Sequence, residues 1–349
     1  MLLQDFKINH KEIDKILVGY INFLGEIKDI PSKIAILYQH CKNFALGPPI
    51  AIIDYGVYSE GGKDIDVCIP IKEFIETDKI DNKYLENVEV LSKTHYGSLE
   101  SINESFQKLA KYFNVHGIPR TEWVRLIFHQ YSKNNPENNE IEIQSGIHPW
   151  DKKLANNIDR VLGEKARKEI MKGRERLFTI ESSNDDRTQW IKLVITRLDK
   201  VANDYEKYDI LSCCAHNFSQ KRINTLRSIY KNTGDIDEVL KEMHKDYAWY
   251  EDPLRKENVI YVTKIPYNRE GYEEATSLKE KKSNYCHCPL VRNHFDIGIP
   301  LIFCNCSAGW YRQLWESILE KPVRIKILKS LIKGDQYCKF AIYLPVYQM

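Results

Sequence analysis

Several features are missing from this sequence, and each absence excludes a class of protein. No apolar run approaches the roughly 18–20 residues that a membrane-spanning helix needs. Residues 1–5 have neither the basic nor the apolar region of a signal peptide. Lys and Arg number 51 against 49 Asp and Glu, and a net charge of +2 gives no electrostatic footprint for nucleic acid. We therefore expect a cytoplasmic protein that has neither a membrane nor a nucleic-acid partner.

Known motifs are also missing. The chain has no motif for a nucleotide cofactor and no helix-turn-helix pattern, which disfavours direct regulation of transcription. The composition is that of a globular protein, because 43% of the 349 residues are hydrophobic and 29% are charged. This length allows two domains. Two of the nine cysteines lie in the first half and seven in the second, which favours domains with different roles. In a reducing compartment they are free thiols or metal ligands.

The first half of the chain repeats one order of elements, strand–helix–strand–strand. Apolar alternation and turn residues predict this order over residues 16–70 and again over residues 87–147. The expected strands are 16–23, 50–55, 64–70, 88–91, 123–128 and 141–144, and the expected helices are 31–45 and 99–113. The sequence therefore predicts an α+β fold with a tandem βαββ repeat.

Four segments of this repeat resemble a known family. They are His95-Tyr96-Gly97, Gly47-Pro48-Pro49-Ile50-Ala51-Ile52, Asp64-Ile65-Asp66-Val67-Cys68-Ile69-Pro70 and Glu142-Ile143-Gln144. In their order and spacing, residues 15–149 resemble the GyrI-like (gyrase-inhibitor-like) effector-binding domains. The resemblance implies a pseudo-two-fold antiparallel sheet, with two helices on one face and a small-molecule cleft on the other. It also implies drug-like ligands, often aromatic or cationic, and some members resemble hydrolases of electrophilic toxins.

Two carboxylates are the main candidates for the ligand site. Alternation places Ile141 and Ile143 on one side of their strand and Glu142 on the other. The alternation of apolar and polar side chains, taken alone, favours a strand whose acidic side chains face solvent on an exposed face of the sheet. The resemblance instead makes Glu142 the ligand-facing glutamate, with Asp66 as its counterpart in the first repeat. Such a carboxylate could pair with a cationic ligand, or act as a general base if burial raised its pKa. The candidate aromatic walls, each of which also fits the core, are Tyr55, Tyr96 and Trp123.

A second domain is expected over residues 150–349, after residues 1–14 as an N-terminal extension and residues 15–149 as the ligand-binding domain. Pro149 ends the sheet at this boundary. An amphipathic helix is expected over residues 151–180, and a terminal hairpin turns at Lys333-Gly334-Asp335. This second domain is therefore expected to be a cysteine-rich α+β domain with helices and an antiparallel sheet.

The tail of this domain carries a second resemblance. Cys306-x-x-Gly309-Trp310 and Gly334-Asp335-x-x-Cys338-x-Phe340-x-Ile342 resemble the end of vinyl-reductase-type ligand-sensing domains. They also resemble a cysteine-rich bacterial family related to aminothiazoline-carboxylate hydrolases. The sensing domains place a glutamate and a cysteine where this chain has Ile327 and Ser330, so their metal site is not carried over.

Two cysteine pairs give the clearest chemical signal, Cys286-His287-Cys288 and Cys304-Asn305-Cys306. In an extended strand, residues i and i+2 point to the same side, so each pair could direct two sulfurs to one point. Four thiolates can hold zinc tetrahedrally, and a redox site is the other chemical interpretation. Alternatively, these cysteines are small buried apolar residues. Cys214 and His216 are a further candidate nucleophile and base.

These observations favour a protein that binds or senses an aromatic or cationic small molecule and holds a cysteine-ligated zinc. The alternative is a hydrolase of electrophilic or toxic small molecules, with Glu142 as the base or a second-domain cysteine as the nucleophile. A protein-interaction scaffold has no positive feature in the sequence. The oligomeric state stays open, with a homodimer as one arrangement.

Overall fold

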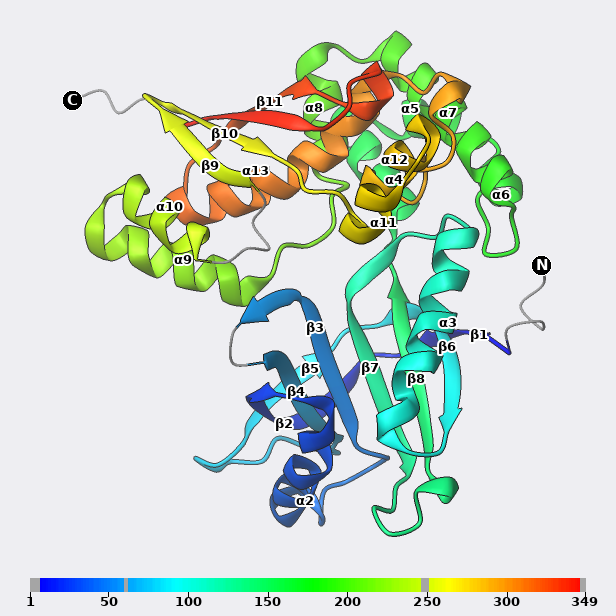
Figure 1. Ribbon diagram of the computed structural model, residues 1–349, viewed down its shortest axis with the longest axis vertical. Coiled ribbons are helices and arrows are strands. Elements are labelled where there is room, and N and C mark those ends of the chain that lie inside the picture. Colours follow the sequence, from blue (N-terminus) through cyan, green and yellow to red (C-terminus); the bar gives the residue numbers. More distant parts are fainter. Residues whose placement is uncertain (1–6, 60–61, 246–250, 346–349) are drawn as a thin grey trace. The chain divides into compact units, whose positions relative to one another are not determined.

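The structure is a computed structural model that describes residues 7–59, 62–245 and 251–345, without the side chains of residues 55–59, 251 and 252. The chain forms two compact units (Figure 1). Unit 1 comprises Met1–Asn114 and Arg120–His148, and unit 2 comprises Val115–Pro119 and Pro149–Met349. The predicted boundary at residues 149 and 150 lies beside this division, while the roles predicted for the two domains stay predictions.

Unit 1 is built on an 8-stranded antiparallel sheet with the strand order β1-β6-β8-β7-β3-β4-β2-β5. The strands are β1 (Asn9–Ile13), β2 (Ile16–Gly25), β3 (Ile50–Ser59), β4 (Gly62–Pro70), β5 (Asp81–Leu85), β6 (Val88–Tyr96), β7 (Arg120–Gln130) and β8 (Glu140–Ile147). The helices are α2 (Ile30–Cys41) and α3 (Ile102–Val115), with short 3-10 turns at Ile27–Asp29, Leu99–Ser101 and Pro136–Asn138.

The tandem βαββ repeat is present as β2-α2-β3-β4 followed by β6-α3-β7-β8. Strands β3 and β7 join the two repeats, in register from Ile50↔Ile127 to Asp54↔Trp123. Two edge strands that the sequence did not predict extend this sheet, β1 beside β6 and β5 beside β2. Residues 9–13, expected to precede the domain, therefore form part of its sheet.

Both helices of unit 1 cover the same face of the sheet. A Cβ atom on Gly19 would lie 3.0 Å from the Cys41 Sγ of α2, and His95 Nδ1 lies 3.1 Å from the Ser105 Oγ of α3. The strand registers place Gly19 and His95 on one face, which also carries most of the buried aliphatic residues. The opposite face, which we call the polar face, carries Asp66, Arg125, Glu142 and Gln144.

Unit 2 combines helices with a 4-stranded antiparallel sheet of order β11-β12-β10-β9. Its strands are β9 (Glu251–Lys256), β10 (Val259–Thr263), β11 (Arg324–Lys329) and β12 (Lys339–Tyr343). Its α-helices are α4 (Trp150–Leu162), α5 (Glu164–Ile170), α6 (Arg174–Leu177), α7 (Asn184–Val201), α8 (Asp204–Ser212), α9 (Gln220–Thr233), α10 (Ile236–His244), α11 (Arg269–Glu274), α12 (Leu278–Tyr285) and α13 (Asn305–Leu319). The 3-10 turns are Phe295–Ile297, Leu301–Cys304 (η6) and Leu331–Lys333.

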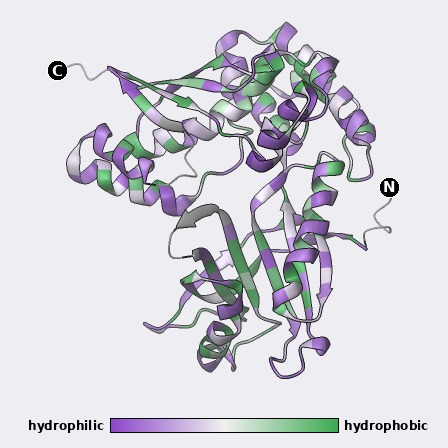
Figure 2. Ribbon diagram, viewed as in Figure 1, coloured by the Kyte–Doolittle hydropathy of each residue, from purple (hydrophilic) through white to green (hydrophobic). Residues whose placement is uncertain are grey.

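The predicted α+β class is confirmed for both units. Hydrophilic and hydrophobic residues alternate along α9 and α10 (Figure 2), and the buried ones include Leu226 and Val239. The terminal hairpin is also present, since β11 pairs with β12. Among the described residues, no helix combines the length and the apolar character that a membrane crossing needs.

One predicted helix is wrong in its continuity. The segment 151–180 contains α4, α5 and α6 rather than a single helix. Gly163 and Gly173 separate them with φ angles of 83° and 87°, backbone conformations that glycine adopts far more readily than other residues. The apolar spacing correctly predicts helical residues in this segment, but it does not show where one helix ends and the next begins.

Helices α13 and α8 approach each other closely at Gly309. A Cβ atom on Gly309 would lie 1.8 Å from the Ser212 carbonyl oxygen, so any side chain there would force the backbones apart. The packing of the two helices therefore depends on the missing side chain.

Gly309→Ala should destabilise unit 2, because overpacking of a core costs roughly 1–3 kcal/mol. We expect a lower unfolding temperature in scanning calorimetry. Ser317→Ala, in the same helix, is the matched control and should leave that temperature nearly unchanged. Equal unfolding temperatures for Gly309→Ala and the wild type would contradict the close approach of α13 and α8.

Candidate functional site

Glu142 lies on the polar face, where β8 runs between β6 and β7. The residue is 5% exposed. The Lys11 ammonium of β1 donates a hydrogen bond to the Glu142 Oε1 at 2.6 Å, and His129 Nε2 lies 3.3 Å from the Oε2. A lysine of the chain itself therefore makes the contact that a ligand cation was expected to make.

Opposing influences set the pKa of the Glu142 carboxyl. Burial raises the pKa, while the hydrogen bond and charge of Lys11 and the contact with His129 lower it. The lowering influences prevail, so the pKa lies below its usual range. Glu142 is therefore a fixed negative charge at neutral pH, and the raised pKa that would suit a general base is not found.

Asp66 has an analogous environment on β4. The Lys83 ammonium of β5 pairs with its Oδ2, and the Asn22 side-chain amide donates a hydrogen bond to its Oδ1 at 2.8 Å. Lys83 also lies over the Tyr20 ring, 4.1 Å from the centroid. Each candidate acid is thus paired with a lysine from an edge strand, Glu142 through β1 and Asp66 through β5.

An apolar cluster lies on the polar face and extends from β7 across β3, β4 and β2 to β5. We call it the apolar patch; its buried members are Val18, Ile50, Cys68, Leu85 and Ile127, and its half-buried members are Ile16, Tyr20 and Ile52. The strand registers place all of them on the same face as Glu142 and Asp66. A ligand with an apolar body could contact the half-buried members while its polar groups reach the charged residues.

Arg125 lies in the middle of the polar face, in register with Ile52 of β3 and Gln144 of β8. It is 5% exposed, and its guanidinium carbon lies 4.7 Å from the centroid of the Trp123 ring. The sequence contained a signal for this residue, since alternation along β7 places Trp123 and Arg125 on one side of the strand. Lys11 carried no such signal, because β1 was not predicted.

The predicted aromatic walls are only partly placed. Trp123 is half-buried on the polar face, whereas Tyr96, at the end of β6, is 68% exposed and is not part of the core. The side chain of Tyr55 lies outside the described residues. Roles for these aromatic residues in ligand binding stay predictions.

The two cysteine pairs differ in backbone geometry, since Cys286 is extended whereas Cys304 and Cys306 are helical. Cys286 and Cys288 follow α12, but Cys304 ends η6 and Cys306 lies in the first turn of α13. Residues two apart on a helix point in nearly opposite directions, so the sulfurs of Cys304 and Cys306 diverge. The Cys304 Sγ lies 3.2 Å from the Ser330 Oγ instead.

Within the described ranges, no group of three or more His, Cys, Asp and Glu residues is placed to hold a metal ion. Burial raises the pKa of Cys286 and of Cys306 to about 11, which favours neutral thiols. Zinc stays a prediction that elemental analysis tests. About one zinc per chain that is lost in Cys286→Ser would support it, and metal-free protein with nine titratable thiols would reject it.

The candidate nucleophile Cys214 lies in surroundings that oppose its ionisation. The Cys214 thiol is fully buried and donates a hydrogen bond to the Ile210 carbonyl oxygen at 3.3 Å. Burial raises its pKa well above the usual range, which opposes formation of the thiolate. His287, between Cys286 and Cys288, donates a hydrogen bond through Nε2 to the Ile265 carbonyl oxygen at 2.9 Å. Burial lowers the pKa of His287 to about 3.

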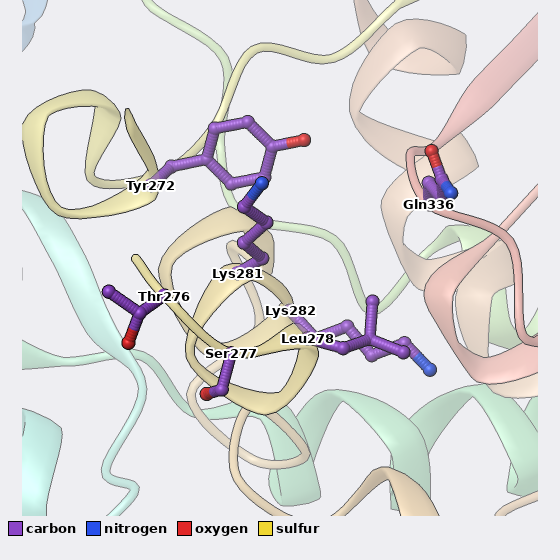
Figure 3. A pocket seen from close by; sticks show the side chains of 7 residues that line it. All are labelled: Tyr272, Thr276, Ser277, Leu278, Lys281, Lys282 and Gln336. Carbon is purple, nitrogen blue, oxygen red and sulfur yellow. The ribbon is translucent and has the colours of Figure 1, made fainter. Parts of the chain in front are cut away.

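Two cavities of about 260 Å³ each lie in unit 2. Tyr272 and Gln336 lie on opposite sides of the first (Figure 3), whose other lining residues are Thr276, Ser277, Leu278, Lys281 and Lys282. The second is lined by Lys153, Ser212, Cys213, Asn217, Gly309, Arg312, Gln313 and Glu316. Neither cavity is lined by a residue that the sequence singled out for catalysis, ligand binding or metal.

Comparisons with known proteins give only distant likenesses. No protein-family model matches the sequence, and no curated protein matches it. Among solved structures, EcmrR in complex with DNA is similar at 17% identity and a TM-score of 0.38, over 42% of this chain and 61% of that chain. This chain thus spans less than two thirds of the length of that protein.

Two other solved structures cover more of their own length. SAV2435, solved with tetraphenylphosphonium bound, is 10% identical with a TM-score of 0.31, over 42% of this chain and 96% of that one. A hydrolase from Listeria innocua is 12% identical with a TM-score of 0.30, over 40% of this chain and 91% of that one. At such scores these likenesses support no conclusion about what this chain does.

The lowered pKa of Glu142 predicts a pH dependence of the stability of unit 1. Because folding favours the ionised form, its contribution is present above the ordinary carboxyl pKa of 4.5 and is lost as the pH falls through the lower folded pKa. We expect Glu142→Gln to lower the free energy of unfolding by about 1–2 kcal/mol at pH 7. Urea denaturation should show this difference shrinking as the pH falls below 4.5.

Glu12→Gln, at an exposed glutamate of β1, is the control and should behave as the wild type at every pH. A difference between the wild type and Glu142→Gln that stays constant from pH 7 to pH 3 would refute the assigned charge state.

Proposed function

We propose that unit 1 binds a small molecule on its polar face, and that the protein is a ligand-binding or ligand-sensing protein of the GyrI-like type. The observation that carries this proposal is the buried, ionised carboxylate of Glu142 on the same face as the apolar patch. A buried charge is costly unless it is paired, as Glu142 is with Lys11, and charged groups beside an apolar surface are typical of sites for small molecules.

Lys11 sets a condition on any cationic ligand. Its side chain is 42% exposed, whereas the Glu142 side chain is 7% exposed. The ammonium can therefore turn into water at small cost, while the carboxylate stays where it is. A ligand cation that displaced Lys11 would meet Glu142 in a preformed position.

The hydrolase alternative finds less support in this geometry. A general base works best with a pKa near the working pH, and that of Glu142 is lowered instead. A nucleophilic cysteine needs a thiolate, and the pKa of Cys214 is raised. Binding without turnover is the simpler function for these residues.

Removal of Lys11 should strengthen the binding of a cation with an aromatic body. We expect Lys11→Met to bind 2-naphthylmethylammonium roughly 5- to 10-fold more tightly than the wild type. In this variant the Lys11 ammonium no longer competes with the ligand for the Glu142 carboxylate. Glu142→Gln should weaken this binding by a similar factor. Isothermal titration calorimetry on the full chain measures both changes.

Lys15→Met is the matched control, since Lys15 forms an exposed pair with Glu86 at 2.8 Å and should leave the affinity unchanged. If neither the wild type nor Lys11→Met bound this cation, or if Glu142→Gln bound it as tightly as the wild type, the proposed role of Glu142 would be wrong.

A further inference from the structure

Arg125 differs from the other buried arginines that the structure describes. Arg187 and Arg292 are 2% and 8% exposed, and both donate hydrogen bonds to backbone carbonyl oxygens, to Ile180 at 2.9 Å and to Cys286 at 2.7 Å. Arg125 is buried to the same degree, at 5% exposure. Its Nε has no hydrogen-bond partner among the described residues.

No carboxylate of the described part of the chain lies within 4.0 Å of the Arg125 guanidinium. The strand registers place several acids on this face. Glu142 is paired with Lys11 and Asp66 with Lys83, Asp64 accepts a hydrogen bond from Asn22, and Asp54 lies in register with Trp123. The guanidinium lies over the Trp123 ring. Burial lowers the pKa of Arg125, as expected for a cation that lacks an anionic partner, although the group stays protonated.

An unpaired buried guanidinium is costly for a protein on its own. An anion that binds offsets part of this cost, since guanidinium and carboxylate form parallel, charge-assisted hydrogen bonds. Arg125 lies beside the apolar patch, and its neighbours Ile52 and Trp123 are only half-buried, so solvent reaches the surface around it. Gln144, opposite Arg125 on β8, has an amide that could donate a further hydrogen bond.

We infer that Arg125 binds the anionic group, a carboxylate or a sulfonate, of an aromatic organic acid whose apolar body covers the half-buried part of the apolar patch. This inference rests on the proposal that the polar face binds a small molecule, and it specifies a charge that the resemblance to GyrI-like domains does not imply. Lys11 and Lys83 support it, because they pair with Glu142 and Asp66 and so reduce the repulsion that an anion meets on this face.

Three probes of one shape and different charge test the inference: 2-naphthoate, 2-naphthamide and 2-naphthylmethylammonium. We expect the full-length wild type to bind 2-naphthoate more tightly than 2-naphthamide in isothermal titration calorimetry. Arg125→Met should weaken binding of the anion roughly 10- to 100-fold, while the affinity for the amide changes less than about threefold. Arg120→Met, at an exposed arginine of β7, is the control and should change neither affinity.

Two further readouts keep the test independent of folding defects. Without ligand, Arg125→Met should unfold at the same temperature as the wild type or higher, because an unpaired buried charge has been removed. Arg125→Lys keeps the charge but not the planar fork, so it should retain part of the preference for the anion over the amide.

Equal affinity of the wild type and Arg125→Met for 2-naphthoate, or binding of the amide and the cation without the anion, would overturn this inference alone. Binding of none of the three probes would overturn the proposed function as well. A lower unfolding temperature for Arg125→Met, with unchanged affinity for the anion, would assign Arg125 a purely structural contact with Trp123.

Discussion

The pairing of β3 with β7 is the constraint on which unit 1 depends. It joins the two repeats at the centre of the sheet and places Arg125 opposite Ile52. Because side chains alternate between the two faces of a strand, a slip of one residue would move Arg125 to the helix-covered face. It would also move Leu126, now fully buried, to the polar face. One register therefore determines both the core and the chemistry of the polar face.

The edge strands give this sheet its particular charge pattern. β1 brings Lys11 to Glu142, and β5 brings Lys83 to Asp66, so neither acid presents a free charge to a ligand. The cation that remains without a partner among the described residues of this face is Arg125. Without β1 and β5, the two repeats would form an acidic site. With these edge strands, Glu142 and Asp66 are paired and the guanidinium of Arg125 is the charge that lacks an anionic partner in the described part of the chain.

The sequence was informative wherever burial gives a periodic pattern, and less so elsewhere. The strands around Ile52 and Ile143 and the helix around Leu109 were predictable from apolar periodicity. β1 was not, because its residues are almost all exposed and it is held by backbone pairing with β6. The spacing of Cys304 and Cys306 does not reveal whether the backbone is extended or helical. The helix that begins there has no side-chain cap, so the sequence carried no signal for its start. Alternation placed Arg125 on the right face, but the lack of a partner is visible only in three dimensions.

The most direct test of ligand binding on the polar face is a methyl NMR spectrum of the isoleucine-labelled full chain, recorded with and without 2-naphthoate. Isoleucines alternate between the two faces in the central strands, so the spectrum separates the faces residue by residue. We expect shifts at Ile50, Ile52 and Ile127 and none at Ile53, Ile65 and Ile143, on the helix-covered face. Shifts confined to the helix-covered face, or to isoleucines of unit 2 such as Ile299 and Ile302, would contradict this expectation.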